Sequence, residues 1–394
     1  MQGTIPLGRV AGIRVRAHWS VLIMIGLVGW VLGTQVLPGV APHRPVTGYW
    51  AAAVLSGVAF VAALLAHELA HSLVARWYGV PVDSITLWAL GGVSELGGEP
   101  PTARADLLIA AAGPATSAAA GAVVGSLAAA IRAGGGPSLA VAACAWLALI
   151  NVVLAVFSLL PGAPLDGGRI LRAALWMRHG DRVRATMTAA GAGRVVGALL
   201  VAAGFGELLV WGDAGGLWLA VVGVFIVSAA AAEASAARAA EALSGLRVAD
   251  VMTPDPDVGA VWMTVADFVA WVVLDSSQTG FPVVGPGGSL AGVTETGRLE
   301  RIPPGGRAGL TLGQVMTAVP PAYLAGPEDP AAPLLSRVPL AGDLLAVVIG
   351  DGHVVGIVTV TKLRQVIQRE TLAPGTARRN PVRERPWPQE STAG

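Results

Sequence analysis

The chain has 394 residues, of which 54% are hydrophobic and 13% charged, and its mean hydropathy is +0.65. This composition excludes an ordinary soluble protein and predicts a polytopic α-helical membrane protein surrounded by membrane lipid. The net charge of +1, without a basic block outside the C-terminal tail, excludes nucleic acid as an expected partner.

The apolar sequence is concentrated in the first part of the chain. We expect a transmembrane domain at 1–240, a soluble α/β domain at 241–371 and a disordered Pro/Arg-rich tail at 372–394. The segment 80–93 is rich in β-branched residues but too short for a helical crossing, which predicts a short membrane-associated β region. About six apolar runs are long enough to cross a bilayer, at about 19–37, 49–78, 106–131, 139–160, 195–211 and 217–232.

Arginines are concentrated on alternate loops between these runs. They lie before the first run, between the second and third, between the fourth and fifth, and after the sixth, whereas the other loops hold little more than Arg44 and Arg132. Cytoplasmic loops carry the excess of basic residues in membrane proteins. We therefore expect a multi-pass protein of the cell membrane with both termini in the cytoplasm.

The second apolar run contains His67, Glu68 and His71. Positions one helical turn apart lie on the same face, so the two histidines can direct their rings at one point, which is a natural site for a divalent metal. The same pattern can arise by chance on the surface of a soluble helix. In lipid, however, each polar side chain costs several kcal/mol unless it has a partner or a function. The apolar setting therefore favours a metal site.

A catalytic zinc site has three protein ligands and leaves a fourth position for water. The best candidate for the third ligand is Asp166, which follows directly on the fourth apolar run within Leu-Pro-Gly-Ala-Pro-Leu-Asp-Gly-Gly-Arg (160–169). Irregular backbone at membrane depth is tolerated only where protein or a cavity surrounds it. The alternative is that Asp166 caps a helix that begins at Gly167.

Glu68 lies slightly around the helix from His67, which would place its carboxylate beside the metal-bound water. There it could remove the proton of the water and later pass it to a leaving amine, so the predicted reaction is hydrolysis of a peptide bond. Asn151 and Ser158, on one face of the fourth run, are candidates to stabilise the oxyanion. Both could equally serve as packing contacts between helices.

An internal repeat follows the membrane domain, with copies at about 245–302 and 309–370. The first copy begins with Val251-Met252-Thr253-Pro254 and the second with Val315-Met316-Thr317. Since neither copy alone would bury its apolar face, we expect the two to pair about a pseudo-twofold axis.

These motifs resemble the site-2 protease family of intramembrane zinc metalloproteases, in the six-span subgroup with a C-terminal pair of CBS domains. The resemblance covers nearly the whole chain. It implies that His67, His71 and Asp166 bind one zinc ion and that Glu68 is the general base. The motifs that carry it are His67-Glu68-Leu69-Ala70-His71, Gly91-Gly92, Ala112-Gly113-Pro114 and Leu165-Asp166-Gly167-Gly168.

The resemblance also implies a substrate class. The substrate would be the transmembrane segment of a membrane-tethered signalling protein, such as an anti-sigma factor or a tethered regulator, already trimmed by a first protease in regulated intramembrane proteolysis. The strand region 87–96, with Gly91 and Gly92, could hold the unwound substrate by β-augmentation. The alternative is a structural hairpin that covers the site. The family usually has an asparagine where this chain has Ser158, and Asn151 matches an earlier asparagine of the family.

CBS domains commonly bind adenine nucleotides and carry an aspartate for the ribose. Arg298 and Lys362 take that place here, which disfavours the usual binding mode and leaves homodimerisation or a lid as roles for the pair. Two other functions are weighed: a transporter gated by its CBS domains, and a catalytically silent homologue that binds membrane proteins. The first would need charges along a path through several helices, and the second would need the loss of a ligand or of Glu68.

Overall fold

The computed structural model describes residues 3–89, 91–212 and 215–372, and the chain divides into two compact units, Met1–Ser235 and Ala236–Gly394. The first unit contains the predicted membrane helices and the second contains the repeat. The predicted tail lies outside the described residues, except for Leu372 at the end of α13 (Val360–Leu372).

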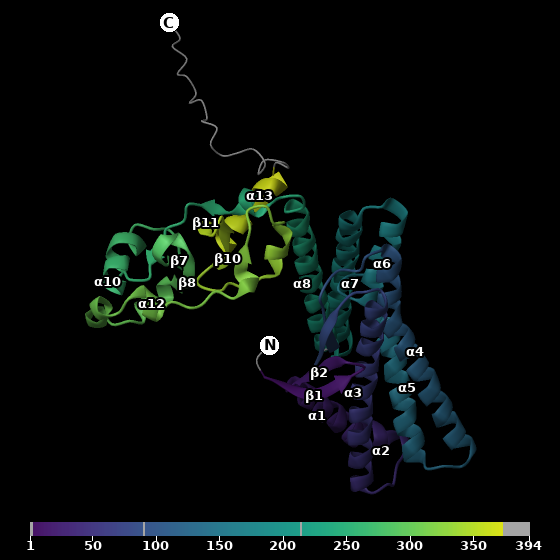
Figure 1. The fold of residues 1–394 in the computed structure, drawn as a ribbon. Helices are drawn as coiled ribbons and strands as arrows, with labels where there is room; N and C mark the ends of the chain where they lie inside the picture. Colours follow the sequence, from purple (N-terminus) through teal and green to yellow (C-terminus); the bar gives the residue numbers. More distant parts are fainter. Residues whose placement is uncertain (1–2, 90, 213–214, 373–394) are drawn as a thin grey trace. The chain divides into compact units, whose positions relative to one another are not determined.

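The described residues include six helices that are long and apolar enough to cross a membrane, which confirms the predicted multi-pass membrane protein. Large side chains on their outer faces, such as Leu55 and Val58, are exposed, as lipid-facing surfaces require. The fifth of these helices begins at Arg182, well before the predicted run, because arginines lower the hydropathy of its first half. The bounds are Ser20–Val40 (α1, Ser20–Val31; a π-helical turn, Leu32–Val36; α2, Leu37–Val40), α3 (Val46–Trp77), α4 (Ala103–Ala133), α5 (Ser138–Ser158), α7 (Arg182–Trp211) and α8 (Gly215–Ala242), with the shorter α6 (Asp166–His179) between α5 and α7 (Figure 1).

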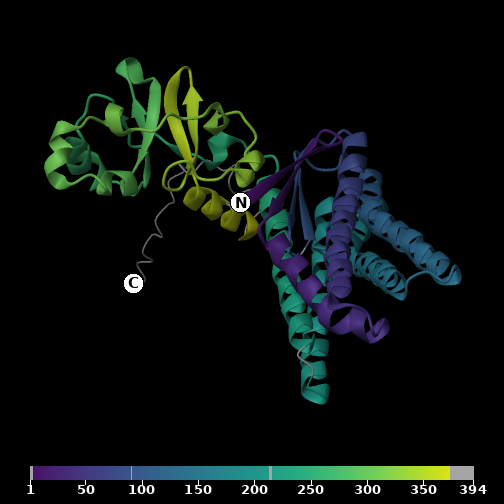
Figure 2. The same ribbon diagram turned by 90° about the horizontal axis from the view of Figure 1, so that it is seen from below.

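A small β-sheet packs against α1 and α3. Its core residues Ile13, Ile85 and Leu87 are fully buried and pack with Val21 and Leu64 of the two helices. The predicted strand region forms β3 and β4. The N-terminal hairpin of β1 and β2 was not predicted, because its glycines and arginines interrupt the apolar alternation that marks a strand. The order is β1 (Thr4–Val10), β2 (Ile13–His18), β3 (Val82–Trp88), β4 (Gly91–Leu96), with β2 and β3 parallel and the other pairs antiparallel (Figure 2).

Glycines bring α7 and α8 into close contact. A Cβ atom at Gly204 would collide with the carbonyl oxygen of Gly216, and a Cβ at Gly197 would collide with that of Gly223. The two helices run side by side in both views (Figures 1 and 2). Small residues of this kind allow membrane helices to approach closely and gain van der Waals contact.

The second unit consists of two copies of one topology. In each copy a short strand runs parallel to the next strand, which is antiparallel to a third that is followed by a helix. The copies exchange segments: β5 (Thr253–Pro254), at the start of the first copy, pairs with β11 of the second, and Thr317, at the start of the second copy, pairs with Val293 of β8 in the first. These are the two paired copies that the repeat predicts. The remaining bounds are α9 (Val248–Val251), β6 (Gly259–Ala260), α10 (Val265–Phe268), β7 (Gly280–Val284), β8 (Leu290–Glu295), α11 (Thr296–Glu300), α12 (Leu312–Val315), β9 (Leu324–Ala325), β10 (Leu344–Gly350) and β11 (His353–Thr359).

The close packing of α7 and α8 makes a prediction about stability. Gly204→Ala should destabilise the protein by about 1–3 kcal/mol, because the added methyl group meets backbone that cannot move away. Gly206→Ala, on the same helix, is the matched control, since a Cβ there meets open space. Thermal unfolding in detergent would compare the two. Equal unfolding temperatures would contradict the packing argument.

Candidate metal centre

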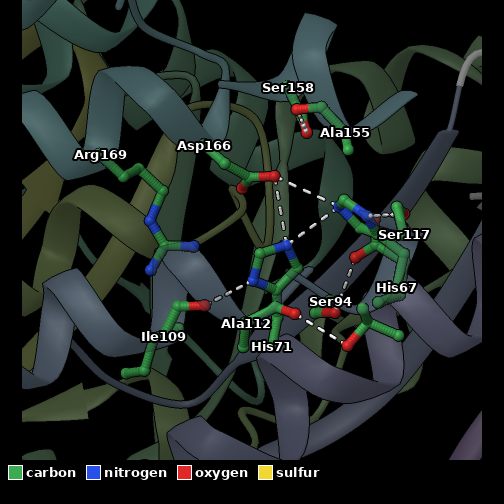
Figure 3. Close-up of polar contacts among 12 residues, drawn as sticks. His67, His71, Ser94, Ile109, Ala112, Ser117, Ala155, Ser158, Asp166 and Arg169 are labelled. Carbon is green, nitrogen blue, oxygen red and sulfur yellow. Dashed lines mark hydrogen bonds and ion pairs between the residues drawn. The ribbon is translucent and has the colours of Figure 1, made fainter. Parts of the chain in front are cut away.

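The fold brings His67 and His71 of α3 together with Asp166, the first residue of α6. The two Nε2 atoms are 3.2 Å apart, and Asp166 Oδ2 lies 3.2 Å from Nε2 of His67 and 3.3 Å from Nε2 of His71. Both histidines are buried, at 4% and 7% exposure. Figure 3 shows the two rings and the carboxylate pointing toward one another. We call these three residues the ligand trio.

The spacing of the ligand trio fits a zinc ion. In a tetrahedral site with bonds of about 2.0–2.1 Å, neighbouring ligand atoms lie about 3.3 Å apart. The observed separations of 3.2 to 3.3 Å match this value. Two imidazole nitrogens and one carboxylate oxygen are also ligands that zinc accepts.

One face of α4 orients the two histidine rings. Nδ1 of His71 donates to the carbonyl oxygen of Ile109 at 2.6 Å, and Nδ1 of His67 lies 2.8 Å from Oγ of Ser117. Between these contacts, a Cβ atom at Gly113 would collide with Nε2 of both rings. Partners at Nδ1 fix the ring orientation and turn Nε2 toward the metal position. Ile109 and Ser117 were not predicted: a backbone carbonyl has no residue signature, and a lone serine in an apolar run is a weak signal.

Tight backbone packing holds Asp166 in place. A Cβ at Gly167 would collide with the carbonyl group of Leu159, and one at Gly193 of α7 would collide with the carbonyl oxygen of Ala163. The capping residue of α6 is Leu165, which makes no side-chain cap bond. The carboxylate of Asp166 instead faces the histidines, so the capping alternative does not describe its position.

Glu68 lies beside the ligand trio and against β4. The hydroxyl group of Ser94 on β4 donates to Oε2 of Glu68 at 3.3 Å, and the hydroxyl group of Ser72 lies 3.1 Å from that of Ser94. A Cβ atom at Gly92 would collide with Cγ and Cδ of Glu68. The neighbouring Gly91 has a φ of 148°, a conformation that favours glycine. The two glycines therefore let the strand run directly over the carboxylate.

A model of Peptidase family M50 matches residues 56–134 and 136–203 of the chain. Rip3 of Mycobacterium tuberculosis is 43% identical over 95% of both chains. The chain belongs to peptidase family M50. The zinc metalloprotease MJ0392 of Methanocaldococcus jannaschii is 30% identical over 76% of this chain and 80% of its own length. The solved structure of the site-2 protease from the same organism is 27% identical, covers 59% of this chain and 95% of that chain, and has a TM-score of 0.41.

Membership of family M50 identifies the protein as a metalloprotease of the site-2 type, with zinc as its metal and a membrane protein as its substrate. The predicted enzyme class is thereby confirmed, and the transporter alternative is not supported.

Asn151 and Ser158, the candidates for oxyanion stabilisation, are both buried on α5. Asn151 donates to the carbonyl of Leu147 at 2.8 Å, and Ser158 donates to that of Ala155 at 3.1 Å. The buried Oδ1 of Asn151 makes no hydrogen bond to any residue that the structure describes. No described hydrogen bond joins either side chain to the ligand trio, so their role in this M50 protease remains a prediction.

The position of Gly113 allows a direct test of the metal centre. Gly113→Ala should lower zinc affinity at least about tenfold, because its methyl group would displace both histidine rings from the metal position. Gly125→Ala on the same helix is the control, since a Cβ there makes ordinary contact with Ala148. Competition with a zinc chelator measures both variants. Wild-type affinity in a folded Gly113→Ala protein would show that the ligand trio does not hold the metal.

Proposed function

We propose that this protein is an intramembrane zinc endopeptidase that cuts within the transmembrane segment of a membrane-tethered signalling protein, such as an anti-sigma factor or a tethered regulator. The observation that carries the proposal is the convergence of His67 and His71 with Asp166 at zinc spacing. The two histidines and Glu68 lie on α3, a helix apolar enough to span a bilayer. Such a placement gives the hydrolytic centre access to peptide bonds that soluble proteases cannot reach.

Each side chain of the centre has a separate task. His67, His71 and Asp166 hold one zinc ion, which when bound supplies a nucleophilic water and polarises the scissile carbonyl. Glu68 accepts the proton of the attacking water and delivers it to the leaving amine. Ser94 holds the Glu68 carboxylate in the direction that this transfer needs.

Strand β4 presents the substrate in this proposal. A transmembrane helix satisfies its amides internally, so it must unwind before hydrolysis, and an exposed edge strand can pair with the extended form. Within the described sheet, β4 is an edge strand. Because Gly92 lies against Glu68, a chain paired with β4 would run close to the base. The competing role for β4 is that of a hairpin that only covers the site. In that case changes to the exposed edge of β4 would not alter the affinity for the substrate.

The C-terminal pair acts in homodimerisation in this proposal, with both termini in the cytoplasm. Arg298, which stands where CBS domains commonly have the aspartate for a ribose, donates to Oγ1 of Thr317 at 2.7 Å. That bond joins the end of the first copy to the start of the second. The bond occupies a guanidinium group where the usual mode needs a carboxylate for the ribose, which disfavours adenine-nucleotide binding in that mode.

Replacement of the proposed base separates chemistry from metal binding. Glu68→Gln should lower proteolysis by about 10²–10⁴-fold while zinc stays bound, because the base is lost and the ligand trio is intact. Membrane proteomes of cells with each form would be compared for short single-pass fragments that accumulate only with the variant. Glu99→Gln is the control, since Glu99 is exposed and pairs with Arg182 away from the trio. If no fragment accumulates even under envelope stress, the silent homologue becomes the better account.

The contact of Ser94 with Glu68 makes a kinetic prediction. Ser94→Ala should lower kcat about tenfold with little change in KM, because a hydrogen bond to a charged group is worth about 1.5–3 kcal/mol. Ser94→Thr keeps the hydroxyl group and should restore most of the rate. Cleavage of a transmembrane peptide in detergent provides both constants. A rise in KM alone would assign Ser94 to substrate binding instead of to the base.

A further inference from the structure

A buried cluster of charges joins α4, α6 and α8 outside the ligand trio. Asp106 of α4 is 0% exposed and receives two hydrogen bonds of 2.9 Å from Nε and Nη2 of Arg172. Nη2 of Arg169 adds a third at 3.3 Å, and Nη1 of Arg172 lies 3.4 Å from Oε1 of Glu233 on α8. We call these four residues the Asp106 cluster.

The charges of the Asp106 cluster balance, with two carboxylates and two guanidinium groups. A buried carboxylate is costly unless it is both paired and hydrogen-bonded, and Asp106 meets both conditions. The two bonds from Arg172 form a fork, which fixes direction as well as distance. The cluster therefore holds α6 at a defined position against α4 and is not a loose surface pairing.

The same face of α4 carries the contacts that orient the histidines. Asp106, Ile109, Gly113 and Ser117 follow one another at helical spacing, and all are buried. The last three fix the rings of His67 and His71, whereas Asp106 fixes α6. Both elements that carry metal ligands are thus positioned by one rigid surface.

The arginines connect this surface to the third ligand. Arg169 and Arg172 lie about one and two turns after Asp166 on the same helix, and their side chains are 22% and 12% exposed. Backbone hydrogen bonds make an α-helix rigid over two turns. Contacts that fix the second turn of α6 therefore also fix the position of its first residue, Asp166. Glu233, on the helix that leads into the C-terminal unit, pairs with Nη1 of Arg172.

We propose that Asp106 is a positioning residue of the metal centre, which sets the place of the Asp166 carboxylate through Arg169 and Arg172. The inference rests on the proposed role of Asp166 as a metal ligand. A merely structural cluster would support the stability of the fold without affecting the metal. The positioning role requires that metal affinity and coordination geometry depend on it.

The test compares Asp106→Asn and Arg172→Gln with the wild type, using the full chain in detergent. Zinc affinity is measured by chelator competition, geometry by the visible spectrum of the cobalt-substituted protein, and stability by thermal unfolding. Zinc affinity should fall about tenfold, the lower end of the effect of losing a direct partner of a ligand, because Asp106 acts on Asp166 only through α6. The cobalt spectrum should shift. Arg178→Gln is the matched control: Arg178 is an exposed residue of α6 with no ion pair among the described residues, and its variant should match the wild type.

Milder variants keep the proposal testable if Asp106→Asn fails to fold. Arg169→Gln and Glu233→Gln each remove one contact and should lower zinc affinity by a smaller factor at little cost in stability. Unchanged affinity and an unchanged cobalt spectrum in the folded variants would overturn the positioning role, even if their unfolding temperatures fall.

The proposed function can fail separately. If the wild type binds zinc no better than His67→Ala, the ligand assignment is wrong and the positioning role falls with it. If zinc affinity depends on Asp106 but the wild type cleaves no membrane protein, the positioning role stands and the proteolytic proposal fails.

Discussion

Two imidazole rings and a carboxylate lie against one another inside an apolar helical bundle. The rest of the membrane unit must supply polar partners for these groups. A polar group in this environment costs several kcal/mol without a partner. Among the described residues, Ser117 and Ile109 meet the Nδ1 atoms of His67 and His71, and Asp166 meets both Nε2 atoms. Each partner comes from a different helix than the histidines, so the bundle must assemble before the centre exists.

The site also requires that backbone segments lie very close to the functional side chains and to one another. Glycine makes this possible at several contacts. Gly113 lets α4 lie against the histidine rings, Gly92 lets β4 run over Glu68, and Gly193 admits the loop before Asp166. A side chain at Gly113 or Gly193 would displace the histidine rings or the loop before Asp166, and one at Gly92 would push β4 away from Glu68. The positions therefore serve the chemistry without contributing a functional group.

The strand β4 connects the reaction to its substrate in the proposed mechanism. Its hydroxyl at Ser94 reaches the carboxylate of Glu68, while the backbone of the same strand forms an edge of the described sheet. A substrate that pairs with this edge would meet the base through one continuous element. The C-terminal unit follows a different principle, in which two copies exchange segments so that neither must be stable alone.

Elements with a local signal could be predicted from the amino-acid sequence alone. Hydropathy located the membrane helices, and helical spacing in an apolar run singled out His67 and His71, to which Asp166 was added from its irregular setting. Tertiary structure decided the rest. The N-terminal hairpin becomes a sheet only by pairing with β3, and the pairing of Asp106 with Arg172 joins residues of two separate helices. Such contacts depend on how the helices pack. The sequence shows that a residue has a carboxylate or a backbone carbonyl, but not which distant group that atom will contact.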